Sequence, residues 1–237
     1  MKKFFVPGLL LVACLYWYLP QPDKLKEEVV ATVERIESTL PTQPARGTES
    51  SSWVIHSATT REGTTAAGQI FSPNPQTPIL FTVGFLMAQH NHNGLEPEAN
   101  FQLILSEWLM DRPAPMEIWA SEPRLLPSIS QNSLSSWQDF DIPHIRLDPS
   151  KEYIAWVTLS ELGNPAGTRI AIHSMGPSYS GPPGSGAKPH YDYAEGHSAF
   201  FREANPNGRR EHMPGFAWQT QNRGHNLHFR MSFESHE

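Results

Sequence analysis

Residues 226–233, Asn-Leu-His-Phe-Arg-Met-Ser-Phe, carry the clearest structural signal in this chain. Apolar and polar residues alternate along the whole stretch. The apolar positions are Leu227, Phe229, Met231 and Phe233, and the polar ones are Asn226, His228, Arg230 and Ser232. Because successive side chains of a strand point to opposite faces, this pattern predicts a β-strand with one buried and one polar face.

Working outward from this stretch, other short segments rich in apolar residues are separated by proline, glycine and asparagine. The predicted strands are residues 52–57, 68–71, 79–87, 101–107, 117–120, 138–142, 153–160, 169–174, 198–202 and 226–234. We find no βαβ alternation and no helical pattern after residue 41. The 22 prolines exceed the 16 glycines, which suits short strands better than long helices. The sequence therefore predicts an all-β fold, an antiparallel β-sandwich of the jelly-roll type.

The N-terminus has the charge pattern of an export signal. Lys2 and Lys3 precede an almost uncharged apolar run at residues 4–19, and the positive end of such a run stays inside the cell. Three fates fit residues 1–22: an uncleaved membrane anchor, a cleaved signal peptide, or a lipoprotein signal with Cys14 as the lipidated residue. Tyr16, Trp17 and Tyr18 extend the run and are typical of an interfacial aromatic belt, which favours the uncleaved anchor.

Residues 23–40 have the periodicity of an amphipathic helix. Apolar residues at spacings of three and four form one stripe, Asp23 is a suitable N-cap, and Pro41 ends the pattern. A lone helix of this length is marginal in water, so its stripe must be buried. Either residues 25–40 self-associate as a short stalk, or they pack on their own domain. Residues 41–51 then form a linker, and residues 52–237 form the predicted sandwich domain.

The composition argues against nucleic acid as a partner and excludes a disulfide within the chain. The formal net charge is −6, so there is no basic footprint for nucleic acid. Cys14 is the only cysteine, so no disulfide forms within the chain and the fold must rest on its core.

Five motifs occur here in a recognisable order. They are Gly-Gln-Ile-Phe at 68–71, Phe-Thr-Val-Gly-Phe-Leu-Met at 81–87, Phe-Gln-Leu-Ile-Leu-Ser-Glu-Trp at 101–108, the stretch from Leu147 to Ser160 with Tyr153 inside it, and the closing strand after Trp218. In this order the chain resembles the bacterial extracellular β-sandwich modules of PEP-CTERM and choice-of-anchor proteins. The resemblance covers roughly residues 52–235.

That resemblance implies a jelly-roll sandwich on the outside of a bacterial cell, and it implies no reaction. Asn226 stands where the family usually has Asp, and the chain carries no C-terminal sorting tail after residue 233. The membrane contact is therefore expected at residues 4–19. The leading hypothesis is a non-catalytic protein of the bacterial cell envelope, on the extracytoplasmic side, that acts in adhesion, glycan contact or envelope assembly without a cofactor.

One motif points to a rival, enzymatic reading. His90, His92 and Glu96 follow Gly84 with the spacing of the first half of a cupin metal motif, and two imidazoles with a carboxylate suit one divalent metal ion. The closing glycine is replaced by Leu103, and the second half lacks its histidine, the nearest being His190. The alternative interpretation is a polar hairpin tip exposed to solvent.

The candidate ligand-binding residues lie in and after a breaker-rich stretch at 177–189, which predicts a long surface loop. They are Tyr179, Tyr191, Asp192, Tyr193 and Trp218. Aromatic rings at loop edges stack on the apolar face of a sugar, and a carboxylate fixes its orientation. The alternative is that Trp218 covers the core and the tyrosines pack the loop. For Trp108, Trp119, Trp137 and Trp156, beside apolar strands, we expect packing roles.

Overall fold

The computed structural model describes most of the chain after residue 50. The described residues are 35–38, 50–57, 64–89, 98–126, 135–175, 178–179, 189–190, 196–202, 209–221 and 225–235. They all belong to one compact unit, Glu34–Glu237.

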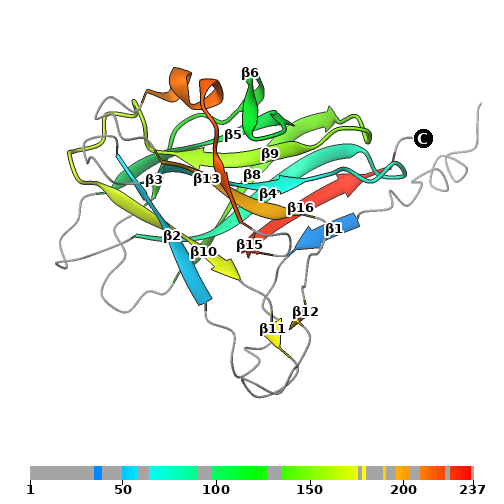
Figure 1. The fold of residues 1–237 in the computed structure, drawn as a ribbon, viewed down its shortest axis with the longest axis horizontal. Helices are drawn as coiled ribbons and strands as arrows, with labels where there is room; N and C mark the ends of the chain where they lie inside the picture. The colour runs from blue at the N-terminus through cyan, green and yellow to red at the C-terminus, as the bar shows by residue number, and fades with distance from the viewer. Residues whose placement is uncertain are drawn as a thin grey trace, which may run out of the picture. The chain divides into compact units, whose positions relative to one another are not determined.

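Strands make up nearly all the regular structure of these residues (Figure 1). They are β1 (Arg35–Ser38), β2 (Ser50–His56), β3 (Thr64–Phe71), β4 (Ile79–Gln89), β5 (Ala99–Leu109), β6 (Arg112–Ala120), β7 (Arg124–Leu126), β8 (Ser136–Arg146), β9 (Tyr153–Thr158), β10 (Arg169–Met175), β11 (Ser178–Tyr179), β12 (Pro189–His190), β13 (His197–Arg202), β14 (Gln219–Thr220), β15 (Asn226–Leu227) and β16 (Phe229–Glu234). A short 3-10 helix, η1 (Arg210–Gly215), is the helical element in the described part. Each of the ten predicted strand segments overlaps an observed strand, so the all-β prediction is confirmed.

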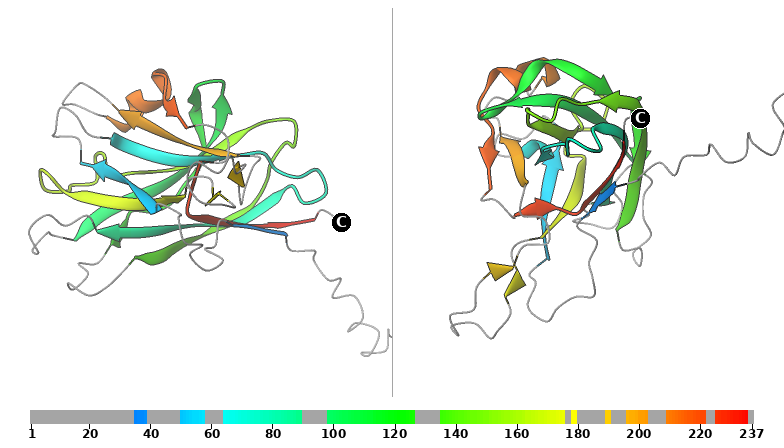
Figure 2. Two further views of the ribbon diagram at one scale, coloured as in Figure 1. Left: turned by 60° about the horizontal axis from the view of Figure 1, so that its bottom comes forward. Right: turned by 90° about the vertical axis from the view of Figure 1, so that its right-hand side faces the viewer.

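The long strands form one mixed sheet in the order β1-β16-β4-β10-β2-β3-β9-β5-β6. Neighbours in this path are antiparallel except β2 and β3, which are parallel and joined by the single pair Ile55–Thr64. β8 is added to β4, β13 to β3 and β7 to β5. The sheet curls at the β2–β3 connection, so that two arms face each other (Figure 2). The first arm contains β1, β16, β4, β8, β10, β2 and β15, and the second contains β3, β9, β5, β6, β7, β13 and β14.

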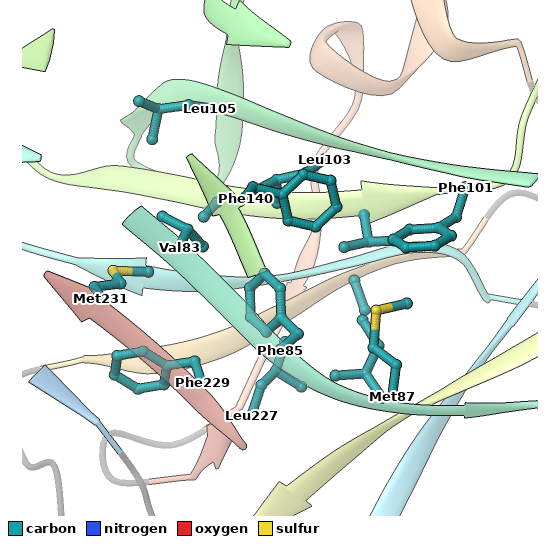
Figure 3. Close-up of a cluster of buried hydrophobic side chains, with 14 of the residues drawn as sticks. Val83, Phe85, Met87, Phe101, Leu103, Leu105, Phe140, Leu227, Phe229 and Met231 are labelled. Carbon is teal, nitrogen blue, oxygen red and sulfur yellow. The ribbon is translucent and has the colours of Figure 1, made fainter. Parts of the chain in front are cut away.

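The main hydrophobic core lies between the two arms (Figure 3). Val83 and Phe85 of the first arm are fully buried, as are Phe101 and Leu103 of the second. The rings of Phe101 and Phe140 meet edge to face, with centroids 5.8 Å apart, a favoured aromatic geometry. The apolar alternation seen in the sequence therefore points inward from both arms.

A second apolar cluster covers the outer side of the second arm, and we call this side the covered face. Its large side chains are Trp108, Trp156, Phe201, Met213 and Trp218. The segment containing η1 lies over β6, where the guanidinium of Arg210 donates to Gln102 Oε1 at 2.6 Å and to both carboxylate oxygens of Glu117. The cover is thus fixed by apolar packing and by one charge-assisted network.

Two of the motifs quoted above meet inside the molecule. Gln69 is fully buried; its Nε2 donates to Asn226 Oδ1 at 2.8 Å, and its Oε1 accepts the backbone N–H of Leu227 at 3.0 Å. Asn226 and His228 were expected on the polar face of one strand, but both are buried. The strand is interrupted at His228 between β15 and β16, and Gln69 supplies the partner that lets Asn226 leave water.

The stretch from Leu147 to Tyr153 forms a tight corner. The hydroxyl of Tyr153 accepts the backbone N–H of Asp148 at 2.8 Å, while Asp148 Oδ1 accepts the N–H of Ser150 at 2.9 Å. The hydrogen bonds that the Asp148 carboxylate accepts from the backbone and the hydroxyl of Ser150 lower its pKa. The motif thus fixes the turn into the buried strand β9.

The predicted helix at residues 23–40 is wrong where it can be compared with the structure. Arg35–Ser38 is a strand, β1, paired antiparallel with β16 through Ile36–Ser232 and three other pairs. The edge of β16 offers unpaired backbone groups, and pairing with them outweighs a weak local helical preference. The other residues of that helix, and the apolar run at 4–19 with Cys14, lie outside the described residues.

No helix within the described ranges is long and apolar enough to span a membrane.

Candidate functional site

The outer side of the first arm is open, and we call it the open face. It carries the side chains that alternate with the core residues of β4, β8 and β16. They are Ile79, Thr82, Leu86, Trp137, Asp139, Asp141, Arg146, Arg230, Ser232 and Glu234, all partly or fully exposed, and the buried Gly84 lies between them. Whereas apolar residues dominate the covered face, this face presents charged, hydroxyl and indole groups on rigid strands.

Gly84 lies at the centre of the open face. In the strand register it stands between Asp139 of β8 and Arg230 of β16. A Cβ at position 84 would collide with Asp139 Oδ1 and would approach Arg230 Cγ to 3.1 Å. The missing side chain therefore lets two residues from the strands on either side of β4 meet above its backbone.

Arg230 and Asp139 form a two-point ion pair at this position. Arg230 Nε donates to Asp139 Oδ1 at 2.6 Å, and a second guanidinium nitrogen donates to Oδ2. The hydrogen bond to Asp139 raises the pKa of Arg230. Their side chains remain 36% and 43% exposed, so unused donors and lone pairs of both groups face solvent.

An aromatic ring lies beside the ion pair. The guanidinium carbon of Arg230 lies 4.7 Å from the ring centroid of Trp137, which is a cation–π distance. Arg124 forms a similar contact nearby, 4.1 Å above the ring of Phe140, and donates to the backbone carbonyl of Asp139. The open face thus combines an indole and a carboxylate from β8 with a hydrogen-bond donor from β16, across the intervening β4, a combination that binds hydroxyl-rich ligands.

Towards the end of β4, two histidines and a serine form a polar cluster. His173 Nε2 and the hydroxyl of Ser135 share a hydrogen bond, and the rings of His173 and His228 meet edge to face at 6.2 Å. Burial lowers the pKa of His173, which favours the neutral imidazole. A catalytic triad adds a carboxylate that orients the imidazole, whereas the ring contact here is with a second histidine. The cluster lies at the edge of the open face, beside the end of β4.

At the start of β4 the face is bordered by His144. This residue has a positive φ of 46° within the irregular pairing of β4 and β8. Its ring stacks on Phe81 with centroids 5.7 Å apart, and its Nδ1 lies 2.6 Å from Glu234 Oε1. The stacking and this polar contact hold the ring in place despite the unusual backbone conformation.

The structure describes two of the five predicted ligand-binding residues. Trp218 is 4% exposed; its indole N–H donates to the carbonyl of Met213 at 3.0 Å, and its ring meets that of Trp156 at 5.4 Å. This is the core-covering role given as the alternative. Tyr179 lies in β11, which pairs with β12. Tyr191, Asp192 and Tyr193 lie outside the described residues.

The predicted metal ligands His90, His92 and Glu96 also lie outside the described residues, so the metal site stays a prediction. Gln89, the residue before them, is paired with Ile170 near the start of β10, whereas the ribbon containing His190 follows the other end of that strand. Within the part of the chain that the structure covers, no three His, Cys, Asp or Glu side chains are placed to bind a metal.

Sequence reasoning missed Trp137, Asp139 and Arg230 as a group. The sequence predicts a packing role beside a strand for Trp137 and a place on a polar face for Arg230. The stretch 137–142, Trp-Gln-Asp-Phe-Asp-Ile, does place Trp137 and Asp139 on the same face of a strand. Nothing local shows that β4 separates β8 from β16, so the group emerges only from the sheet order.

Comparison with known protein families, curated proteins and solved structures gives no significant match. The open face must therefore be interpreted from its own geometry.

Proposed function

We propose that this chain is a non-catalytic binding module of the bacterial cell envelope, and that its open face contacts a glycan built of uncharged sugars. The observation that carries the proposal is the exposed Asp139–Arg230 pair above Gly84, beside the ring of Trp137. A carboxylate accepts hydrogen bonds from neighbouring sugar hydroxyls, a guanidinium donates to ring and hydroxyl oxygens, and an indole packs on the apolar side of the sugar.

The charge of the open face favours uncharged sugars over acidic ones. Asp139, Asp141 and Glu234 contribute three carboxylates, against two guanidiniums, from Arg230 and from Arg146 of β8. An anionic polysaccharide would bring more negative charge to a face that is already acidic, which weakens association. Neutral sugars meet no such repulsion.

The proposal also covers the cellular location of the protein and the type of its all-β fold. The export pattern at residues 1–22, with the apolar run at 4–19, supports a membrane tether with the domain on the extracytoplasmic side. The two arms facing each other across one core support a sandwich, and the order of the motifs supports the jelly-roll type. Self-association through the segment at 25–40 would, at residues 35–38, compete with the pairing of β1 and β16.

Binding of the full-length chain, in detergent micelles, to neutral polysaccharides and to an acidic pectate tests the proposal by calorimetry. We expect a neutral polysaccharide to bind, and we expect Trp137→Ala and Arg230→Ala each to weaken that binding about tenfold.

Lys151→Ala is the matched control. Lys151 Nζ pairs with Glu107 Oε2 at 2.8 Å, and the pair is about as exposed as Arg230–Asp139 but lies on the second arm. Its loss should leave binding unchanged. Equal weakening by Arg230→Ala and Lys151→Ala would contradict a site on the open face, and preference for pectate would contradict the choice of uncharged sugars.

A further inference from the structure

The hairpin between β5 and β6 exposes apolar side chains at its tip. Met110 is 96% exposed and has a positive φ of 54°, and the adjacent Leu109 is 40% exposed. Positive φ is strained for a side chain with Cβ, and glycine, asparagine or aspartate usually occupies such a position. A methionine here is unfavourable on two counts in water, in backbone conformation and in apolar exposure.

A second segment holds its own apolar side chain next to this tip. The N–H of Trp218 donates to the carbonyl of Asp111 at 2.7 Å, and Arg112 donates to the carbonyl of Gly215 at 3.2 Å. Phe216, between these two contacts, is 56% exposed. Figures 1 and 2 show η1 and β6 on the same side of the sheet. Leu109, Met110 and Phe216 therefore lie on adjoining segments, and we call them the apolar tip.

The apolar tip is rigidly supported from below. Trp108 precedes it in β5 and is buried, with its ring 6.3 Å from that of Trp218 in an edge-to-face contact. The ring of Phe216 lies 6.5 Å from that of Phe201, a member of the same cluster. The exposed side chains are thus carried by a packed base, which limits the entropy lost when they bind.

The charges around the apolar tip balance one another. Arg112 pairs with Asp111 at 2.8 Å, and Arg209 pairs with Glu211 at 3.3 Å. Arg210 is paired with Glu117. With cations and carboxylates matched, this surface has no net attraction for an anionic partner, so its binding energy must come from apolar burial.

We propose that the apolar tip contacts the interface of the bilayer to which the chain is tethered. This inference rests on the membrane tether of the proposed function. About 15 residues separate Leu19 from Arg35, and an extended chain of that length reaches about 50 Å. Such a tether gives an effective concentration in the millimolar range, so that a contact of three side chains suffices. Methionine, leucine and phenylalanine bury in the interfacial region, while arginine keeps its charge at the headgroups.

The test uses the full-length chain reconstituted in phosphatidylcholine vesicles. With Cys14 replaced by Ser, a polarity-sensitive fluorophore is attached to a cysteine introduced by Met110→Cys, and lipids carrying a shallow spin label serve as quenchers. The matched control is Leu125→Cys: Leu125 is 47% exposed, and β7 pairs with the opposite end of β5. We expect loss of fluorescence at position 110, none at 125, and the same result when anionic lipid is added.

The possible results distinguish a failure of the bilayer contact from a failure of the membrane tether. If the chain floats with the vesicles but position 110 is no more quenched than 125, the bilayer contact is refuted and the tether stands. If neither this chain nor the chain with Cys14 intact floats with the vesicles, the tether itself fails. A blue shift at position 110 without quenching by lipid would mean that a protein surface covers the tip, which also overturns the proposal. Met110→Asn, which suits positive φ, should keep the fold and, with the probe moved to Phe216→Cys, reduce its quenching.

Discussion

The covered face and the open face are both outer sides of the same curled sheet, but only the covered face is buried by a further segment. Both consist of alternate side chains on strands whose other side faces the main core. On the covered face these side chains are mostly apolar, and the η1 segment buries Trp108, Trp156 and Trp218. On the open face they are mostly polar, and Trp137 stays partly exposed beside Arg230.

One glycine lies in the strands beneath each face, and the different neighbours of Gly68 and Gly84 show how the two faces differ. A Cβ at Gly68 would meet Ala155 O and Trp156 Cβ, both at 2.6 Å, which are fixed parts of the neighbouring strand. At Gly84 the obstacle is the end of the Asp139 side chain. One glycine therefore allows tight packing of backbone, and the other makes room for an exposed ion pair. Buried packing is concentrated on the first face, and the second is the one for which we propose recognition.

The largest contrast is expected between the tryptophans of the two faces. Trp218→Ala removes a buried ring and its hydrogen bond to Met213, so the free energy of unfolding should fall by about 3–5 kcal/mol. Trp137→Ala on the open face should lower it by about 1 kcal/mol or less. Urea denaturation of both variants checks this. Equal losses would mean that the open face is as much a part of the core as the covered one.

The two glycines give an intermediate contrast. Gly68→Ala forces backbone apart and should reduce the free energy of unfolding by about 2–3 kcal/mol. Gly84→Ala only displaces an exposed ion pair and should reduce it by less than about 1 kcal/mol, while weakening glycan binding as Arg230→Ala does. Thermal denaturation and calorimetry measure the two effects. A larger stability loss at Gly84 than at Gly68 would reverse the assignment of the faces.

The smallest effect is expected from pH, through His173 at the edge of the open face. Burial lowers its pKa in the folded chain below the ordinary value of 6.5. As the pH falls below 6.5, His173 becomes protonated in the unfolded chain, whereas in the folded chain it stays neutral until the pH reaches its lowered pKa. The free energy of unfolding therefore decreases over this pH range. Urea denaturation from about pH 7.5 to about pH 5 should show this loss, reduced in His173→Asn. His212→Gln, at an exposed position, serves as control and should behave as the unmodified chain does.

Much of the fold could be predicted because its strands show their period in the sequence. Residues 229–233 alternate strictly, and the structure buries Phe229, Met231 and Phe233 while Arg230 and Ser232 stay partly exposed. The helical period was wrong at residues 35–38, because the local pattern contains no information about the free edge of β16. The burial of Asn226 depends on Gln69, 157 residues away, and a short-range pattern does not record such a partner.

The candidate site was harder to predict than the fold. Which outer side of a curled sheet remains open depends on where the segment around η1 lies, and that segment has no strong period. Trp218 and Trp137 are both aromatic residues beside strands, so their sequence contexts do not separate a buried ring from an exposed one. Their roles differ because Trp218 packs against Trp156, whereas Trp137 lies beside a charged side chain.

The position of β16 has a consequence for how the protein is made. This strand, at residues 229–234, lies between β1 and β4 in the interior of the first arm. The ribosome synthesises those residues after all the other described strands, so the arm stays incomplete until translation has passed residue 234. A nascent chain that cannot close its sheet early remains unfolded for longer.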